Sequence, residues 1–191
     1  MSTATERPID AEERAEFENY AKSGLRLLSA SESSESSALV AAVDAHVAAH
    51  QKAQRGFLSK LLSKTIDNTH VALALGIVWG NEIVRALGWK WTCIIREGEE
   101  RYAVVSVDRS LAVYATYFVK ECLDNSYTDC TILLSYNMLL KNAIPAQTPN
   151  SFFSVMPAVF RIVSKSAATQ RSWWRHPRPN PFMSGSRRQG A

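Results

Sequence analysis

The sequence predicts an α+β domain in which helices pack on one face of a small three-stranded antiparallel meander. Three observations lead to this fold class. Apolar residues recur every three or four positions in two segments between residues 38 and 87, which is typical of helices. After Gly88 the period changes to two over three short segments that end near residue 113. Helical spacing then returns in the following part of the chain.

Length and composition favour one domain with additional segments at its ends. The chain has 191 residues, of which 46% are hydrophobic and 21% charged, as in ordinary globular proteins. We expect residues 38–168 to form a single α+β domain. An acidic, serine-rich segment at residues 1–37, with a short helix around residues 11–28, precedes it. Residues 169–191 are expected to be a basic, disordered tail, because they are rich in proline and lack any periodicity.

The net charge of +4 arises from the tail. From Arg171 onward the chain has five arginines and no acidic residue, and the remainder has 17 basic and 18 acidic residues. The predicted domain therefore gives no electrostatic reason to expect a nucleic acid as its partner.

The cysteines and the apolar segments indicate a cytoplasmic protein without a membrane anchor. Cys93, Cys122 and Cys130 are too few and too far apart for a disulfide framework or a CxxC zinc pair. The first 20 residues lack the apolar run of a secretory signal. The most apolar helical run, Val71–Gly80, has ten residues, whereas a bilayer requires about 20.

The first helix of the domain is predicted over residues 38–64, with Ser36 or Ser37 as its N-cap and a weak point at Gly56. A second helix is predicted to begin near Asp67 or Asn68 and to end at Leu87. Its first half is apolar on all sides and rich in small residues, which suits a central helix that its neighbours approach closely. Gly88 lies where a left-handed C-terminal cap is expected.

The meander is predicted from WKWTCIIR, the turn EGEE and the returning segment RYAVVSV, followed by SLAVY. Alternation places Trp89, Trp91, Cys93 and Ile95 on one face of the first strand. We expect Trp89 and Trp91 to be buried against the helix that precedes the strand.

Three more helices are predicted after the meander. The first covers residues 116–123, and the second covers CTILLSYNMLLKN with Thr128 or Asp129 as its cap. Pro145 and Pro149 then interrupt the chain. The last helix is predicted from PNSFFSVMPAVFRIVSKSA, with Pro157 either kinking it or opening its second half.

The run LGIVWGNEIVRALGWKWTCI, followed by ERYAVVSVDRSLAVYATYFVKECL, resembles an uncharacterised bacterial domain family. In that family a helix ending in LGWxW leads into a short meander and then a hydrophobic helix. The resemblance covers residues 68–143, and the family has no assigned activity. Such domains are similar to immunity proteins of contact-dependent toxin systems, so the resemblance implies a partner protein, such as a toxin, that the chain neutralises by binding.

Two groups of residues are candidate binding sites. Asn81, Glu82 and Arg85 form a polar cluster on the otherwise apolar helix, where Glu82 and Arg85 have the spacing of an ordinary i, i+3 ion pair. If they are buried, they are a polar site with a function. In the tail, arginines alternate with aromatic residues, which suits stacking on single-stranded nucleic acid or contact with a protein partner. The tail candidates are Trp173, Trp174 and Arg175.

The histidines are the basis of a third hypothesis, a metal-dependent hydrolase. His46 and His50 have the i, i+4 spacing of a metal-binding pair, but no glutamate adjoins the first histidine and no third ligand is evident. The sequence has no motif of established catalytic chemistry, and Cys93 has no neighbouring histidine in the sequence. We therefore expect no enzyme, no cofactor and no metal.

The sequence thus predicts a cytoplasmic protein whose function is stoichiometric binding of another protein, and the resemblance implies a bacterial immunity or adaptor protein. A nucleic-acid-binding accessory protein that uses the tail is the second hypothesis.

Overall fold

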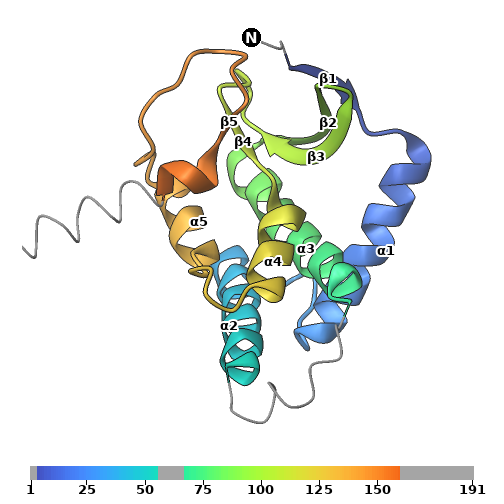
Figure 1. Ribbon diagram of the computed structural model, residues 1–191. Helices are drawn as coiled ribbons and strands as arrows, with labels where there is room; N and C mark the ends of the chain where they lie inside the picture. The colour runs from blue at the N-terminus through green and yellow to red at the C-terminus, as the bar shows by residue number, and fades with distance from the viewer. Residues whose placement is uncertain (1–3, 56–66, 160–191) are drawn as a thin grey trace, which may run out of the picture. The chain divides into compact units, whose positions relative to one another are not determined.

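A computed structural model describes residues 4–55 and 67–159. Figure 1 shows an α+β fold, which confirms the predicted class. The helices are α1 (Ala11–Leu27), α2 (Ser36–Gln54), α3 (Thr69–Leu87), α4 (Ala115–Asp124) and α5 (Ile132–Leu140). The strands are β1 (Thr5–Pro8), β2 (Lys90–Arg96), β3 (Glu99–Val105), β4 (Leu111–Val113) and β5 (Phe153–Ser154).

The sheet has five strands in the order β1-β2-β3-β4-β5, so the prediction of three strands was wrong. The predicted meander β2-β3-β4 is its centre, with antiparallel neighbours. β1 pairs antiparallel with β2, and β5 pairs parallel with β4. The sequence of β1, TERP, is too polar and too short to show alternation, and β5 has two residues. Both depend on pairing with a neighbouring strand rather than on local propensity.

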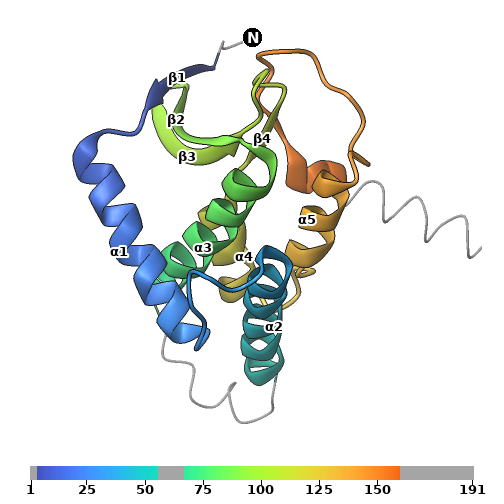
Figure 2. The ribbon, with the colours of Figure 1, turned by 180° about the vertical axis from the view of Figure 1, so that it is seen from behind.

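The N-terminal segment is part of the fold. β1 joins the sheet, and α1 packs along α3 (Figure 2). Asp10 and Glu13 form a capping box that begins α1: each side chain accepts a hydrogen bond from the backbone N–H of the other residue. The chain divides into two units, Met1–Val159 and Phe160–Ala191, and the second lies outside the described residues, as does the predicted boundary near residue 168.

α3 is the central helix, and α1, α2 and α4 all pack against it. Its glycines permit this close packing: a Cβ added at Gly76 would lie 2.5 Å from Thr116 Cα, and one at Gly80 would lie 2.1 Å from Trp91 Cζ2. Gly88 ends the helix in the left-handed conformation, with φ of 66°, as predicted. Among the described helices, α3 is long and apolar enough to cross a membrane, but ten of its residues are buried inside this fold, as in a core helix.

The boundaries of α2 and α5 differ from the predictions. α2 ends at Gln54 with Glu35 as its N-cap, and the rest of the predicted helix, including Gly56, lies outside the described residues. α5 has Thr131 at its N-cap position, without a side-chain cap from within the segment. Instead Asp44 of α2 accepts a hydrogen bond from the backbone N–H of Leu133 at 3.1 Å. A cap supplied by another helix cannot be read from local sequence.

The segment predicted as the last helix begins as a strand. Phe153 and Ser154 form β5, and the helical conformation starts at Val155 and is described through residue 159. Phe152 is buried in a small cluster on the sheet, with Ile94, Ala103, Val105 and Ala112. Burial of Phe152 against the sheet therefore outweighs the helical pattern around it.

Candidate functional site

The predicted polar cluster on α3 connects parts of the fold. The indole Nε1 of Trp91 donates a hydrogen bond to Asn81 Oδ1 at 2.9 Å. Glu82 is buried and forms an ion pair with Arg85. The Arg85 guanidinium also donates to Ser36 Oγ and to the backbone oxygens of the segment before α2, those of Glu32 and Ser34. These contacts join α3 to β2 and to the serine-rich segment, which is a structural role.

Trp91 itself is only partly buried. It packs on Gly80 of α3, as predicted, and on Phe17 of α1, with ring centroids 5.0 Å apart. Trp89 is also partly exposed, so the prediction that both tryptophans are buried was wrong. A pocket of about 440 Å³ opens beside Trp91 and Asn81, between α1 and the serine-rich segment. Its charged lining residues are Arg14, Glu18, Lys22 and Glu32.

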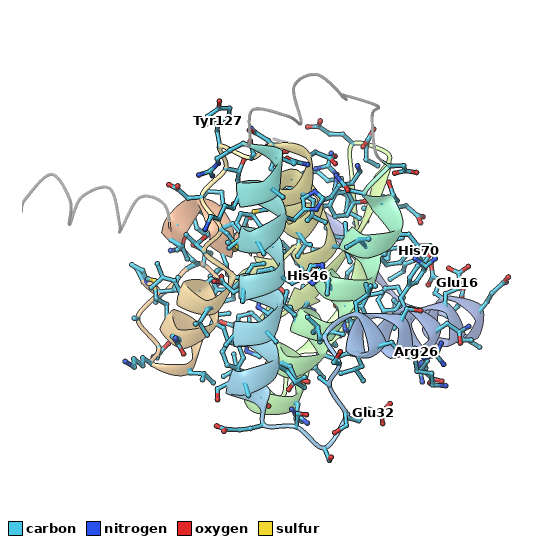
Figure 3. All side chains as sticks on the ribbon, turned by 90° about the horizontal axis from the view of Figure 1, so that it is seen from below. Glu16, Arg26, Glu32, His46, His70 and Tyr127 are labelled. Atoms are coloured by element: carbon cyan, nitrogen blue, oxygen red, sulfur yellow. The ribbon has the colours of Figure 1, made fainter. Side chains whose placement is uncertain are left out.

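Of the other sequence candidates, the histidines lie within the described residues and the tail residues do not. Trp173, Trp174 and Arg175 lie outside the described residues. His46 lies on α2 (Figure 3), and its pKa is lowered by burial and by the nearby His50. His50 Nε2 lies 2.8 Å from the side-chain nitrogen of Gln54. Within residues 4–55 and 67–159, no group of three His, Cys, Asp or Glu residues could hold a metal ion.

A network that the sequence did not predict surrounds Arg7 on β1. The Arg7 guanidinium donates to both carboxylate oxygens of Glu13, at 2.8 and 2.9 Å, and to Glu100 at 2.7 Å. The Tyr102 hydroxyl donates to Glu13. The hydrogen bonds from Arg7 and Tyr102 lower the pKa of Glu13 to about 2. Burial and the hydrogen bond to Glu13 raise the pKa of Tyr102 to about 12. We call these four residues the Arg7 network: Arg7, Glu13, Glu100 and Tyr102. The Arg7 network holds α1 on the sheet.

Cys93 lies beside the Arg7 network, with its sulfur 3.6 Å from Glu100. Its thiol is fully buried, and desolvation raises its pKa. A thiol that resists ionisation is a poor nucleophile, so the geometry gives Cys93 a packing role.

A larger pocket, of about 590 Å³, lies near the turn of the β2–β3 hairpin. It is on the face of the sheet opposite to the Arg7 network. We call it the Tyr–Arg pocket. It is lined by Ile94, Arg96, Glu97, Glu99, Arg101, Tyr114, Tyr117 and Ser154.

The hairpin register positions the charged residues of the Tyr–Arg pocket. Glu97 and Gly98 both have positive φ, of 57° and 83°, which gives the tight two-residue turn that suits a hairpin. Arg96 therefore pairs with Glu99, and Ile94 pairs with Arg101. Paired residues project from the same face of a sheet, and so do residues two apart on one strand, so these four side chains share the face of the pocket.

The start of α4 provides the aromatic wall. Tyr114 and Tyr117 meet edge to face, with ring centroids 6.5 Å apart. The Arg101 guanidinium lies over the Tyr117 ring, 5.7 Å from its centroid, and its Nη2 lies 3.4 Å from Glu99. Tyr117 is 45% exposed. Burial raises the pKa of both tyrosines, so their hydroxyls are protonated donors at neutral pH.

None of these pocket residues was singled out from the sequence. The pocket combines a hairpin, the start of a helix and a two-residue strand, which lie up to about 60 positions apart in the chain. The available signal was local: two arginines flank the EGEE turn, and two tyrosines lie three positions apart at the start of a helix. Each is common in surface segments and is unspecific alone.

Comparison with protein-family models, with curated protein sequences and with solved structures finds no match to this chain.

Proposed function

We propose that this chain binds another protein stoichiometrically and that the Tyr–Arg pocket is the recognition site. The observation that supports this most is the combination of two arginines and two tyrosines around one open pocket. Tyrosine and arginine are enriched at protein interfaces and among the residues that contribute most to binding. Their long side chains here extend from a hairpin and a helix, so the site has a structured frame.

We propose that the chain acts in a bacterial cytoplasm, as an immunity or adaptor protein without catalysis. The three cysteines are free thiols, as is usual in a reducing compartment. The proposed partner is a protein such as a toxin, in keeping with the resemblance of residues 68–143 to immunity-like domains. Nucleic-acid binding through the tail remains a prediction from the sequence alone.

The test of this function is capture followed by reconstitution. The tagged full chain is expected to retain one protein from a lysate of its native cell, and the Tyr117→Ala variant is expected to lose it. The captured protein is then purified and titrated with the chain in a calorimeter. Binding of one chain per partner is the expected result.

A suitable control is Tyr127→Ala. Tyr127 is 81% exposed, projects from the loop after α4 (Figure 3) and lies at the opposite end of that helix from Tyr117. This variant should bind like the wild type. Equal binding by the Tyr117→Ala variant, or the absence of a reconstituted complex, would contradict the proposal.

A further inference from the structure

The charged groups of the Tyr–Arg pocket indicate what kind of partner segment fits it; this inference rests on the proposed function. Two guanidinium groups, those of Arg96 and Arg101, line the pocket together with the carboxylates of Glu97 and Glu99. Among the described residues Arg96 has no ion pair, and Arg101 has one, with Glu99 at 3.4 Å. The side chains of that pair are 54% and 70% exposed. An exposed pair at this distance contributes little stability, so a ligand can replace it at low cost.

The aromatic wall orients Arg101. The guanidinium lies over Tyr117, and a planar cation that is stacked in this way keeps its N–H groups available at its edge. Such an edge matches a carboxylate, which accepts two parallel hydrogen bonds from one guanidinium. The tyrosine rings provide apolar surface beside the two cations, whereas Ile94 is buried.

We propose that the Tyr–Arg pocket binds a side-chain carboxylate from an acidic segment of the protein partner. Arg96 and Arg101 donate hydrogen bonds to the carboxylate, and an apolar or aromatic neighbour in the same segment packs on Tyr117. The carboxylate takes the place of Glu99 beside Arg101. Glu99 is therefore an internal competitor of the ligand, and its charge sets the affinity of the site.

Because Glu99 competes with the ligand, substitutions of Glu99 and Arg101 should change the affinity in opposite directions. Arg101→Gln removes a bidentate donor and should weaken binding of an acidic peptide about tenfold or more. Glu99→Gln removes the competitor and should tighten binding severalfold. Lys52→Gln removes a positive charge from an exposed position on α2 and should change nothing. A general electrostatic effect of net charge would instead make Lys52→Gln resemble Arg101→Gln.

The measurement is a nuclear magnetic resonance titration of the isotope-labelled full chain with two short peptides that are acetylated and amidated at their ends. One has two acidic residues between phenylalanines, and the other has the corresponding amides. The acidic peptide should shift the backbone signals of Arg101 and Tyr117, and the amide peptide should not. Equal shifts by both peptides, or weaker binding by Glu99→Gln, would overturn the inference.

Two further ligands distinguish the source of the anion. A peptide with a free C-terminal carboxylate and no acidic side chain, and inorganic phosphate, are titrated in the same way. Tighter binding of either one at the Tyr–Arg pocket would overturn the assignment to an acidic side chain.

The inference and the proposed function fail in distinguishable ways. A reconstituted complex that is lost in Tyr117→Ala but unchanged in Arg96→Gln and Arg101→Gln would leave the recognition site in place and overturn the role of the carboxylate. A peptide titration as expected, together with no complex from the native cell, would support the carboxylate site and contradict the proposed function.

Discussion

Arg85 is the clearest case of a residue whose sequence context suggested binding and whose contacts are structural. Its guanidinium pairs with the buried Glu82 and donates to Ser36 at the start of α2 and to two backbone oxygens of the segment before it. A buried carboxylate that loses its cation is costly, because burial in a low dielectric disfavours the charged form. The stability of this region therefore depends on Arg85.

We predict that Arg85→Ala lowers the free energy of unfolding by about 1–3 kcal/mol, the range for leaving a buried polar group without its partner. Adding Glu82→Gln to Arg85→Ala should recover part of the loss, since it removes the unpaired charge. Chemical denaturation of the single and double variants measures both effects. A fully stable Arg85→Ala variant that no longer binds the partner would show instead that this cluster is a recognition site.

At the scale of elements, the sequence predicted those that show a local periodic pattern and missed the two outer strands, β1 and β5. The helices with strong periodicity, α2 and α3, were expected, because 3.6-residue spacing is a local property. The hairpin was expected from alternation and the turn around Gly98. β1 and β5 were not, because their pairing energy comes from strands that are distant in the chain. The Tyr–Arg pocket was missed for the same reason.

The Arg7 network gives the attachment of β1 and α1 a pH dependence. Glu13 has a pKa of about 2 in the folded chain, against an ordinary value of 4.5. A depressed pKa stabilises the folded state at pH values above the ordinary pKa, and this contribution is lost as the pH falls from about 4.5 toward 2. We predict that Glu13→Gln lowers the melting temperature at pH 7.

The same variant should lose less stability than the wild type between pH 4.5 and pH 2, because its side chain cannot be protonated in that range. Thermal melting followed by circular dichroism at a series of pH values measures both quantities. Glu16→Gln, on the same helix, is the matched control, since Glu16 is exposed. Parallel pH profiles for the wild type and Glu13→Gln would refute the role of Glu13.

At the scale of the whole molecule, helices of the described part of the chain pack around α3, and an open pocket lies on the sheet. The arginine-rich tail is a separate source of positive charge. The two lead to different predictions about binding. Recognition by the Tyr–Arg pocket requires the folded unit, whereas nucleic-acid binding would require the tail arginines and release counterions.

We predict that deletion of residues 171–191 leaves the melting temperature and the affinity for the protein partner unchanged. The affinity of the full chain should change little between about 50 and 200 mM salt, whereas a tail-bound nucleic acid would dissociate steeply over this range. Calorimetric titration of both chains at the two salt concentrations measures this. A truncated chain that folds but does not bind its partner would transfer recognition to Trp173, Trp174 and Arg175.

Photocrosslinking in the native cell tests the recognition site most directly. A photoreactive phenylalanine analogue is placed at Tyr117 in one chain and at Tyr127 in another, so that the probe lies in the Tyr–Arg pocket or at the far end of α4. We predict a crosslink to one partner protein from position 117 and none from position 127. A crosslink to the partner from position 127 alone would contradict it.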